Sequence, residues 1–214
     1  MLGLTIGEKH TYNDFRLKML SSFVVSPPEP VVNKIQIPGM DGMLDISESL
    51  SNEVVYSNRT LSVKFLLEEQ DEESQQRRMN EIYNYLHGRI HNICPDMDKD
   101  YEYNGRVTVS FTPIGCFYEV TILADVFPYK MKRGSTVVAQ QVIEQATIIC
   151  YNERKSVVPI IDVDADFRVK YGDLSVSLSA GKNLVPDIKF YQGFNKVVCY
   201  GTGNITFTYR EGSL

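Results

Sequence analysis

Five segments of this chain alternate strictly between apolar and polar residues, and this pattern limits the fold more than any other. In Thr60–Phe65, for example, every second residue is apolar. A period of two is typical of a strand that buries one face and exposes the other. The segments are 60–65, 107–112, 161–169, 174–178 and 205–210. We therefore predict a mainly β protein of the α+β class.

One segment has a helical period instead. Met79, Ile82, Tyr83 and Leu86 follow the spacing i, i+3, i+4, i+7, which places them on one face of a helix. Three acids at 71–73 lie where the helix dipole favours negative charge, and Gly88 suits a left-handed cap. These residues predict one helix over 72–87 that packs on a sheet.

A change in composition near residues 127–134 predicts two domains. This stretch combines a proline, a basic cluster and a glycine after a strand-like run. We expect a β-rich domain with one helix over residues 1–132. Residues 133–214 then contain about six short strands separated by turns, a spacing typical of a small β-sandwich. Pro27–Pro30 reads as an extended connector.

Charge and hydropathy argue against several classes of function. The 214 residues carry a net charge of −5, whereas proteins that hold a nucleic acid backbone usually present a basic face. Apolar runs such as Val157–Ile161 are too short to span a bilayer, and we expect no signal peptide. The four cysteines form no metal-binding pair, so we expect buried free thiols in a protein made in a reducing cytoplasm.

No residue pattern supports a catalytic or metal site. Asp96–Asp100 begins like a calcium loop, but Tyr101 and Val107 stand where that loop requires glycine and glutamate. The three histidines match no metal motif, and neither a nucleophile elbow nor a phosphate loop is present. Asp162, Asp164 and Asp166 are expected to form a row facing water on one strand. We therefore expect no catalytic residue, no cofactor and no small-molecule substrate.

The stretch Ile37–Asp45 concentrates two glycines, a proline and two acids in one short turn. Alone it indicates a tight turn that leads into a strand, with backbone angles that favour glycine. Loops of special shape in assembly proteins often contact a neighbouring subunit. This gives Pro38, Gly39, Asp41, Gly42 and Asp45 as candidate interface residues.

Short motifs lie both before and after this turn. Their order and spacing along the chain resemble those of the distal tail proteins of long-tailed bacteriophages. The resemblance covers nearly the whole chain, since its motifs reach both ends. The matching positions are Gly7, His10, Asp14–Phe15, Pro38–Gly39, Gly42, Asp45, Arg59, Leu86–Gly88, Tyr101–Arg106, Phe127–Lys130 and Tyr209–Leu214.

The resemblance implies a structural virion protein without enzymatic activity. Such proteins form a hexameric ring from their N-terminal domains, with a small galectin-like β-sandwich outside it, and the ring joins the tail tube to tail-tip or baseplate components. The chain would then be made in the bacterial host cytoplasm, reside in the virion tail, and bind neither nucleic acid nor membrane. The resemblance adds Arg59, Tyr103, Gly105 and Arg106 to the candidate interface or motif residues.

A carbohydrate-binding or adhesion module is the alternative. Such a module would also be a β-sandwich rich in tyrosine, of which this chain has 13. It predicts a monomer with an exposed aromatic platform, so the oligomeric state separates the two hypotheses.

Overall fold

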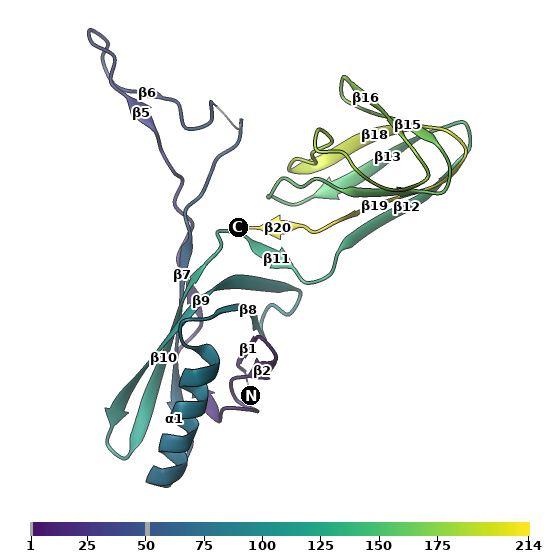
Figure 1. Cartoon of the computed structure of the whole chain (residues 1–214). Coiled ribbons are helices and arrows are strands. Elements are labelled where there is room, and N and C mark those ends of the chain that lie inside the picture. The colour runs from purple at the N-terminus through teal and green to yellow at the C-terminus, as the bar shows by residue number, and fades with distance from the viewer. Residues whose placement is uncertain (1, 50–51) are drawn as a thin grey trace. The chain divides into compact units, whose positions relative to one another are not determined.

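The computed structural model describes residues 2–49 and 52–214, which form two compact units that divide between Pro128 and Tyr129 (Figure 1). Each unit has its own apolar core. The chain is mainly β with a single helix among the described residues, so the predicted α+β class is confirmed. No helix in residues 2–49 or 52–214 has the length and apolarity needed to cross a membrane.

The first unit is built on one antiparallel sheet in the order β2-β1-β8-β9-β10-β7-β3, and β4 also pairs with β7. Its longest ladder joins β9 to β10 from Gly105↔Val126 to Ile114↔Phe117. The elements of this unit are β1 (Leu4–Ile6), β2 (Lys9–His10), β3 (Leu17–Met19), β4 (Val24–Val25), β5 (Lys34–Ile35), β6 (Leu44–Asp45), β7 (Arg59–Leu67), α1 (Glu72–Leu86), β8 (Ile90–Pro95), β9 (Tyr101–Ile114) and β10 (Phe117–Val126).

Helix α1 forms where the sequence predicts it. The carboxylate of Asp71 caps its first turn by accepting a hydrogen bond of 2.8 Å from the backbone N–H of Ser74. Met79, Ile82 and Leu86 are buried in the core of the first unit, as expected. Gly88 follows the last turn with a φ of +75°.

The predicted buried face of α1 is wrong at one residue, Tyr83, which is 45% exposed and stacks on His87 with ring centroids 4.2 Å apart. The buried stripe runs instead through Gln75. Its side-chain amide donates hydrogen bonds of 2.9 Å to the carbonyls of Glu69 and Cys116, which satisfies a polar group inside the core.

Between β4 and β7 the chain forms a long hairpin, residues 26–58, which we call the arm. Strands β5 and β6 pair at its far end through Lys34↔Asp45 and Ile35↔Leu44 (Figure 1). Nearer the sheet its two sides are joined by a hydrogen bond of 2.8 Å from Val31 N–H to the Val55 carbonyl. No described residue of the arm is fully buried, so this hairpin lies outside the core of the first unit.

The second unit is a sandwich of two four-stranded sheets, with orders β12-β19-β14-β17 and β13-β18-β15-β16. One apolar core, which includes Ile161, Val169, Val197 and Phe207, draws on strands of both sheets. Its strands are β11 (Lys130–Lys132), β12 (Thr136–Val142), β13 (Gln145–Asn152), β14 (Ile160–Val163), β15 (Phe167–Tyr171), β16 (Leu174–Leu178), β17 (Gly181–Leu184), β18 (Gly193–Tyr200), β19 (Gly203–Tyr209) and β20 (Gly212–Ser213).

Strands β11 and β20 pair with each other at the two ends of this unit, through Lys130↔Ser213 and Met131↔Gly212. The buried carboxylate of Glu211 accepts from Lys132 at 3.1 Å and also from the Thr136 hydroxyl. Strand β11 therefore belongs with the sandwich, and the observed division falls four residues before the expected one.

The segment 161–169, which alternates as one strand, is two strands in different sheets. β14 ends at Val163 and β15 begins at Phe167. At the corner, Asp164 accepts hydrogen bonds of 2.7 Å from the backbone and side-chain N–H groups of Asn204, and Asp166 accepts from Ala180 N–H at 3.3 Å. The predicted row of aspartates on one strand is therefore wrong, because two of them cap the passage between sheets.

The cysteines are free thiols, as expected, but Cys116 is exposed whereas Cys94, Cys150 and Cys199 are buried. The prediction that all four are buried is thus wrong for Cys116, which lies in the turn between β9 and β10. Burial raises the pKa of the Cys150 thiol to about 12 and that of the Cys199 thiol to about 11.

Stability of the second unit is expected to fall at alkaline pH. An unfolded thiol ionises near pH ~8.5, so above that pH the unfolded chain releases two protons that the folded unit retains until about pH 11 to 12. The stabilising contribution is complete below the unfolded pKa and is lost as the pH rises. Denaturant unfolding at pH 8 and pH 10.5 measures it. A Cys150→Ala/Cys199→Ala variant should show a smaller decrease, and equal decreases would contradict the assignment.

Candidate functional site

The glycine-rich stretch lies at the tip of the arm. Met40 N–H donates to the Ile37 carbonyl at 3.1 Å, and Gly39 has a φ of +82°. With Pro38 before Gly39, this is the geometry of a type II turn. A Cβ at Gly39 or Gly42 would meet nothing within 4 Å, so the backbone angles, and not crowding, call for glycine.

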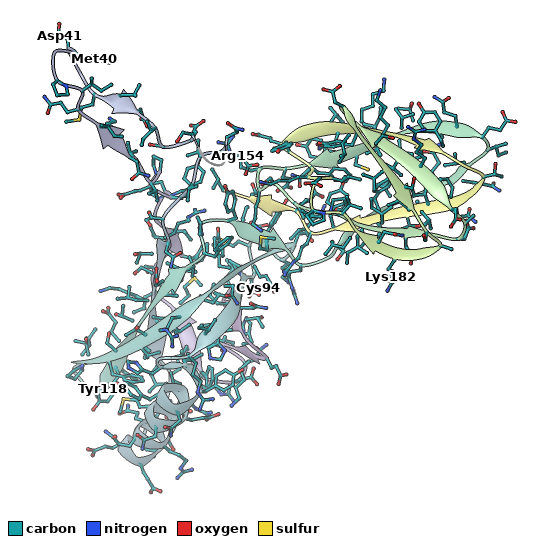
Figure 2. All side chains as sticks on the ribbon, turned by 45° about the horizontal axis from the view of Figure 1, so that its top comes forward. Met40, Asp41, Cys94, Tyr118, Arg154 and Lys182 are labelled. Atoms are coloured by element: carbon teal, nitrogen blue, oxygen red, sulfur yellow. The ribbon has the colours of Figure 1, made fainter. Side chains whose placement is uncertain are left out.

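Polar groups brace the arm behind this turn. Asp45 accepts from the backbone N–H of Ser47 at 3.0 Å and from its hydroxyl, and these bonds lower the pKa of the Asp45 carboxyl. The same hydroxyl accepts from Asn33 N–H at 2.7 Å across the hairpin. Asp45 thus shapes the arm, whereas Asp41 is exposed at its tip beside Met40 (Figure 2).

The arm exposes an unusual amount of apolar surface. Eight of its large apolar side chains are between 40% and 58% exposed: Val31, Val32, Ile35, Ile37, Met40, Met43, Leu44 and Val55. Part of this surface borders a hollow of about 560 Å³ between Pro30 and Tyr56. Large exposed apolar surface commonly marks a protein interaction site. Four of the eight, Ile37, Met40, Met43 and Leu44, lie in the stretch that the sequence singles out. The other four were not predicted, although apolar residues that follow neither a strand period nor a helix period are a signal for them.

Arg59 fixes the base of the arm. Its side chain is 8% exposed, and it donates hydrogen bonds of 2.8 Å to the Ser26 carbonyl and 3.0 Å to the Pro128 carbonyl. The guanidinium also lies 5.8 Å from the ring centre of Tyr103. One cation therefore ties the first residue of the arm to the last residue of the first unit.

Replacing Arg59 with Met is expected to loosen the arm. The Ser26 and Pro128 carbonyls would lose their donor, at a cost of ~1–3 kcal/mol for each buried group. Limited proteolysis with thermolysin, which cleaves beside exposed apolar residues, should then cut within residues 26–58 several times faster. Arg77→Met, at an exposed helix position, is the matched control. Equal rates in both variants would contradict the anchoring role.

The remaining candidate residues support the sheet instead of lying on the arm. Gly105 is buried where a Cβ would come within 2.2 Å of the Asp125 carbonyl oxygen, so the β9–β10 ladder needs glycine there. Arg106 donates to the Gly88 carbonyl just beyond α1. The structure thus brings together Arg59 and Tyr103, while the turn from Pro38 to Asp45 forms a separate group.

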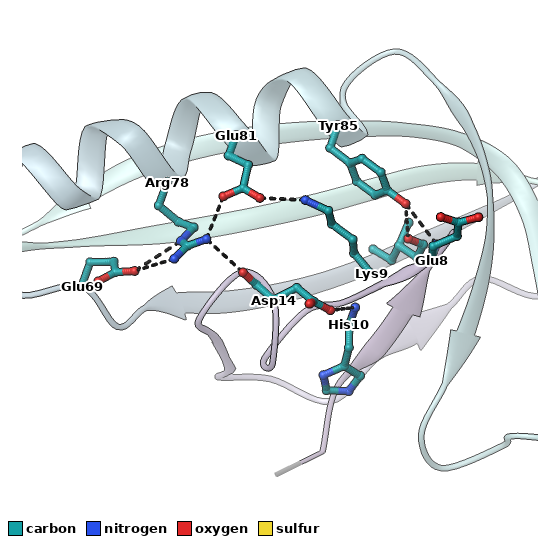
Figure 3. A network of polar contacts seen from close by, with 9 residues as sticks. Glu8, Lys9, His10, Asp14, Glu69, Arg78, Glu81 and Tyr85 are labelled. Carbon is teal, nitrogen blue, oxygen red and sulfur yellow. Dashed lines mark hydrogen bonds and ion pairs between the residues drawn. The ribbon is translucent and has the colours of Figure 1, made fainter.

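The motif at the start of the chain also has a structural role (Figure 3). Lys9 on β2 contacts Glu81 on α1 at 2.7 Å, and Arg78 joins Glu81 at 2.7 Å and the Asp14 carbonyl at 3.0 Å. The Asp14 carboxylate accepts from His10 N–H at 2.7 Å. These contacts hold the first two strands against the helix.

The described residues 2–49 and 52–214 contain no group of three His, Cys, Asp or Glu that could hold a metal ion. Asp96, the first residue of the calcium-like segment, accepts from Gly3 N–H at 2.9 Å and contacts the His10 ring at 3.0 Å. His91 contacts the Tyr85 carbonyl, and His87 accepts from Val109 N–H. Asp96 and the three histidines therefore have roles within the fold.

This fold, a sheet with one helix and an arm together with a β-sandwich, has a counterpart among solved structures. It is similar to the crystal structure of SPP1 Dit (gp 19.1), described as a paradigm of the hub adsorption apparatus in phages that infect Gram-positive bacteria. The TM-score is 0.72 over 100% of both chains, at 16% sequence identity. No family model matches the sequence, and no curated protein matches it significantly.

Proposed function

We propose that this chain is a structural component of a phage tail, which forms a hexameric ring at the distal end of the tail and joins the tail tube to the tail-tip or baseplate proteins. In this proposal the first unit builds the ring, and the second unit, a galectin-like sandwich, is peripheral. The observation that carries it is the likeness in fold to SPP1 Dit over the whole of both chains. The protein has a structural role and no enzymatic one.

The arm supplies a physical reason for assembly. A ring requires two different patches on each subunit to meet repeatedly until the rotation closes. The exposed apolar residues of the arm would be costly to leave in water, at about 25 cal/mol for each Å², and contact with a neighbouring subunit would cover them. We therefore place Pro38, Gly39, Asp41, Gly42 and Asp45 at or beside the ring contact. Arg59, Tyr103, Gly105 and Arg106 support it from within the first unit.

Electron microscopy of the concentrated protein, alone and mixed with the tail tube protein, tests the ring. We expect six-fold rings in at least one of the two samples. Monomers only, or a two-fold dimer in both samples, would contradict the proposal.

Polar substitutions on the arm are expected to prevent ring formation. Met40→Ser/Met43→Ser removes apolar surface that is 45% and 58% exposed, so the fold of the first unit should remain intact. Light scattering should show monomers for this variant under conditions where the unmodified chain forms rings. Met97→Ser, at a residue 57% exposed outside the arm, is the control and should still form rings. Rings formed equally by both variants would remove the arm from the contact.

A carbohydrate-binding or adhesion module is the second candidate, and one observation favours it. Tyr151 and Phe194 form an aromatic pair with ring centroids 5.3 Å apart, and their side chains are 50% and 80% exposed. A stable monomer in every sample described above would favour this module over the ring.

A further inference from the structure

The outer face of the sheet β13-β18-β15-β16 differs in chemistry from the rest of this acidic chain. Tyr151 on β13 lies directly opposite Phe194 on β18, and both point away from the core, since their neighbours Cys150 and Asn195 are buried. Beside them Ile149 is 60% exposed. A protein leaves such an aromatic cluster in water at a cost, and clusters of this kind commonly mark a binding surface.

The other end of the same face is polar. Arg168, Lys170, Asp173, Ser175 and Tyr200 line a hollow of about 530 Å³. The Arg168 guanidinium donates to the Ser175 hydroxyl at 2.9 Å, which holds it over the sheet surface. The hollow therefore presents one oriented guanidinium, a lysine, a carboxylate and a tyrosine ring together.

The two ends belong to one continuous track along β18. Tyr200 lies six positions after Phe194, a length of about 20 Å at ~3.3 Å per residue. Lys196 is exposed between them, opposite Ile149. The four strands of this sheet contain three exposed cations, Arg168, Lys170 and Lys196, and no Asp or Glu, although the whole chain has a net charge of −5. One acid, Asp173 in the turn between β15 and β16, lines the hollow beside them, so cations still outnumber acids on this face.

We propose that this face binds a linear anionic polysaccharide, with a sugar ring on the Tyr151–Phe194 platform and carboxylate or phosphate groups along the three cations. A saccharide chain presents apolar C–H faces and hydroxyl groups in every unit, which matches aromatic rings interspersed with Thr147, Ser175 and Ser177 hydroxyls. A protein partner would instead favour a continuous apolar centre with a polar rim. The site involves the second unit alone and does not depend on ring formation.

Affinity electrophoresis of the full chain tests the proposal with two polymers of the same backbone. Carboxymethyl cellulose is anionic and hydroxyethyl cellulose is neutral. We expect the anionic polymer to retard the protein strongly and the neutral polymer to retard it weakly. Retardation should decrease as salt is raised, because the contacts with the cations are exposed to solvent.

Two variants separate the two parts of the site. Phe194→Ala and Arg168→Gln/Lys170→Gln should each weaken binding about tenfold, a change of ~1.4 kcal/mol. All three side chains are exposed, so the fold should persist. Leu184→Ser and Lys182→Gln, at exposed positions of β17 in the opposite sheet, are the matched controls and should bind like the unmodified chain.

Three results would overturn the proposal. One is the absence of retardation by carboxymethyl cellulose, polygalacturonate and hyaluronate alike. Another is equal retardation by polyglutamate, which would show that the face binds any polyanion. The third is equal binding by the Phe194→Ala variant and the Leu184→Ser control, which would remove the aromatic platform from the site.

Discussion

A chain that carries Ile82→Asp is expected to lose the fold of its first unit. Ile82 is 0% exposed and packs in the same core as Met79 and Leu86. An aspartate there would bury an unpaired charge in apolar surroundings, at a cost of several kcal/mol. Because the free energy of unfolding of a whole domain is only ~5–15 kcal/mol, one such change removes most of the stability of the first unit.

Circular dichroism and denaturant unfolding measure this effect. The helical signal should disappear, while the second unit, which has a separate core, should still unfold cooperatively. Tyr83→Asp is the matched control, since it places the same charge one position along α1 at a residue that is 45% exposed. If Ile82→Asp left the protein as stable as this control, α1 would not pack as described.

Gly105→Ala is expected to have the second-largest effect. The added Cβ would lie 2.2 Å from the Asp125 carbonyl oxygen and 2.6 Å from the Val126 Cα. Both are backbone atoms of the adjacent strand β10, so no side chain can turn away to make room. Overpacking of this kind costs typically ~1–3 kcal/mol and occasionally more.

The melting temperature of the first unit should fall by several degrees in this variant. Loss of about 2 kcal/mol lowers the melting temperature of a domain of this size by ~6–12 °C. Gly134→Ala provides the control, because a Cβ there would meet nothing within 4 Å. An unchanged melting temperature for Gly105→Ala would show that β9 and β10 are further apart than described.

The regular elements could be predicted from the sequence because their side-chain periods are local. The alternation in 60–65 and 107–112 identified β7 and β9, and the spacing of Met79, Ile82 and Leu86 identified α1. Tyr83 was misplaced because it lies at the edge of the buried stripe, where a shift of one residue decides between core and water. The four cysteines show the same limit, since only the β9–β10 turn decides that Cys116 is exposed.

The segment 161–169 shows where local pattern fails. Alternation continues through the corner, because Ala165 is partly buried between two aspartates that point outward. The change of sheet depends on contacts with residues distant in the chain. These are the pairing of β14 with β19 and of β15 with β18, and the hydrogen bonds from Asn204 and Ala180, which are 40 and 14 positions away. A pattern with a period of two contains no information about which sheet a strand joins.

The candidate residues divide in a similar way. A turn at Pro38–Gly39 follows from the residues themselves, since proline and glycine fit its two central positions. The exposed apolar surface of the arm and the contacts of Arg59 with Ser26 and Pro128 depend on residues distant in the chain. The sequence therefore predicted the turn at the tip of the arm, but it did not predict which apolar side chains the arm exposes.

The pairing of β11 with β20 has a consequence for exchanging parts between proteins of this fold. Since Lys130 and Ser213 are partners in one short ladder, the first and last strands of the second unit lie side by side. Arg210 and Glu211 strengthen this closure through Lys132. The segment from residue 133 to residue 209 therefore begins and ends at neighbouring points of the structure. Domains with adjacent ends tolerate insertion and replacement, so a different β-sandwich could be grafted between β11 and β20 without stretching the backbone of the first unit.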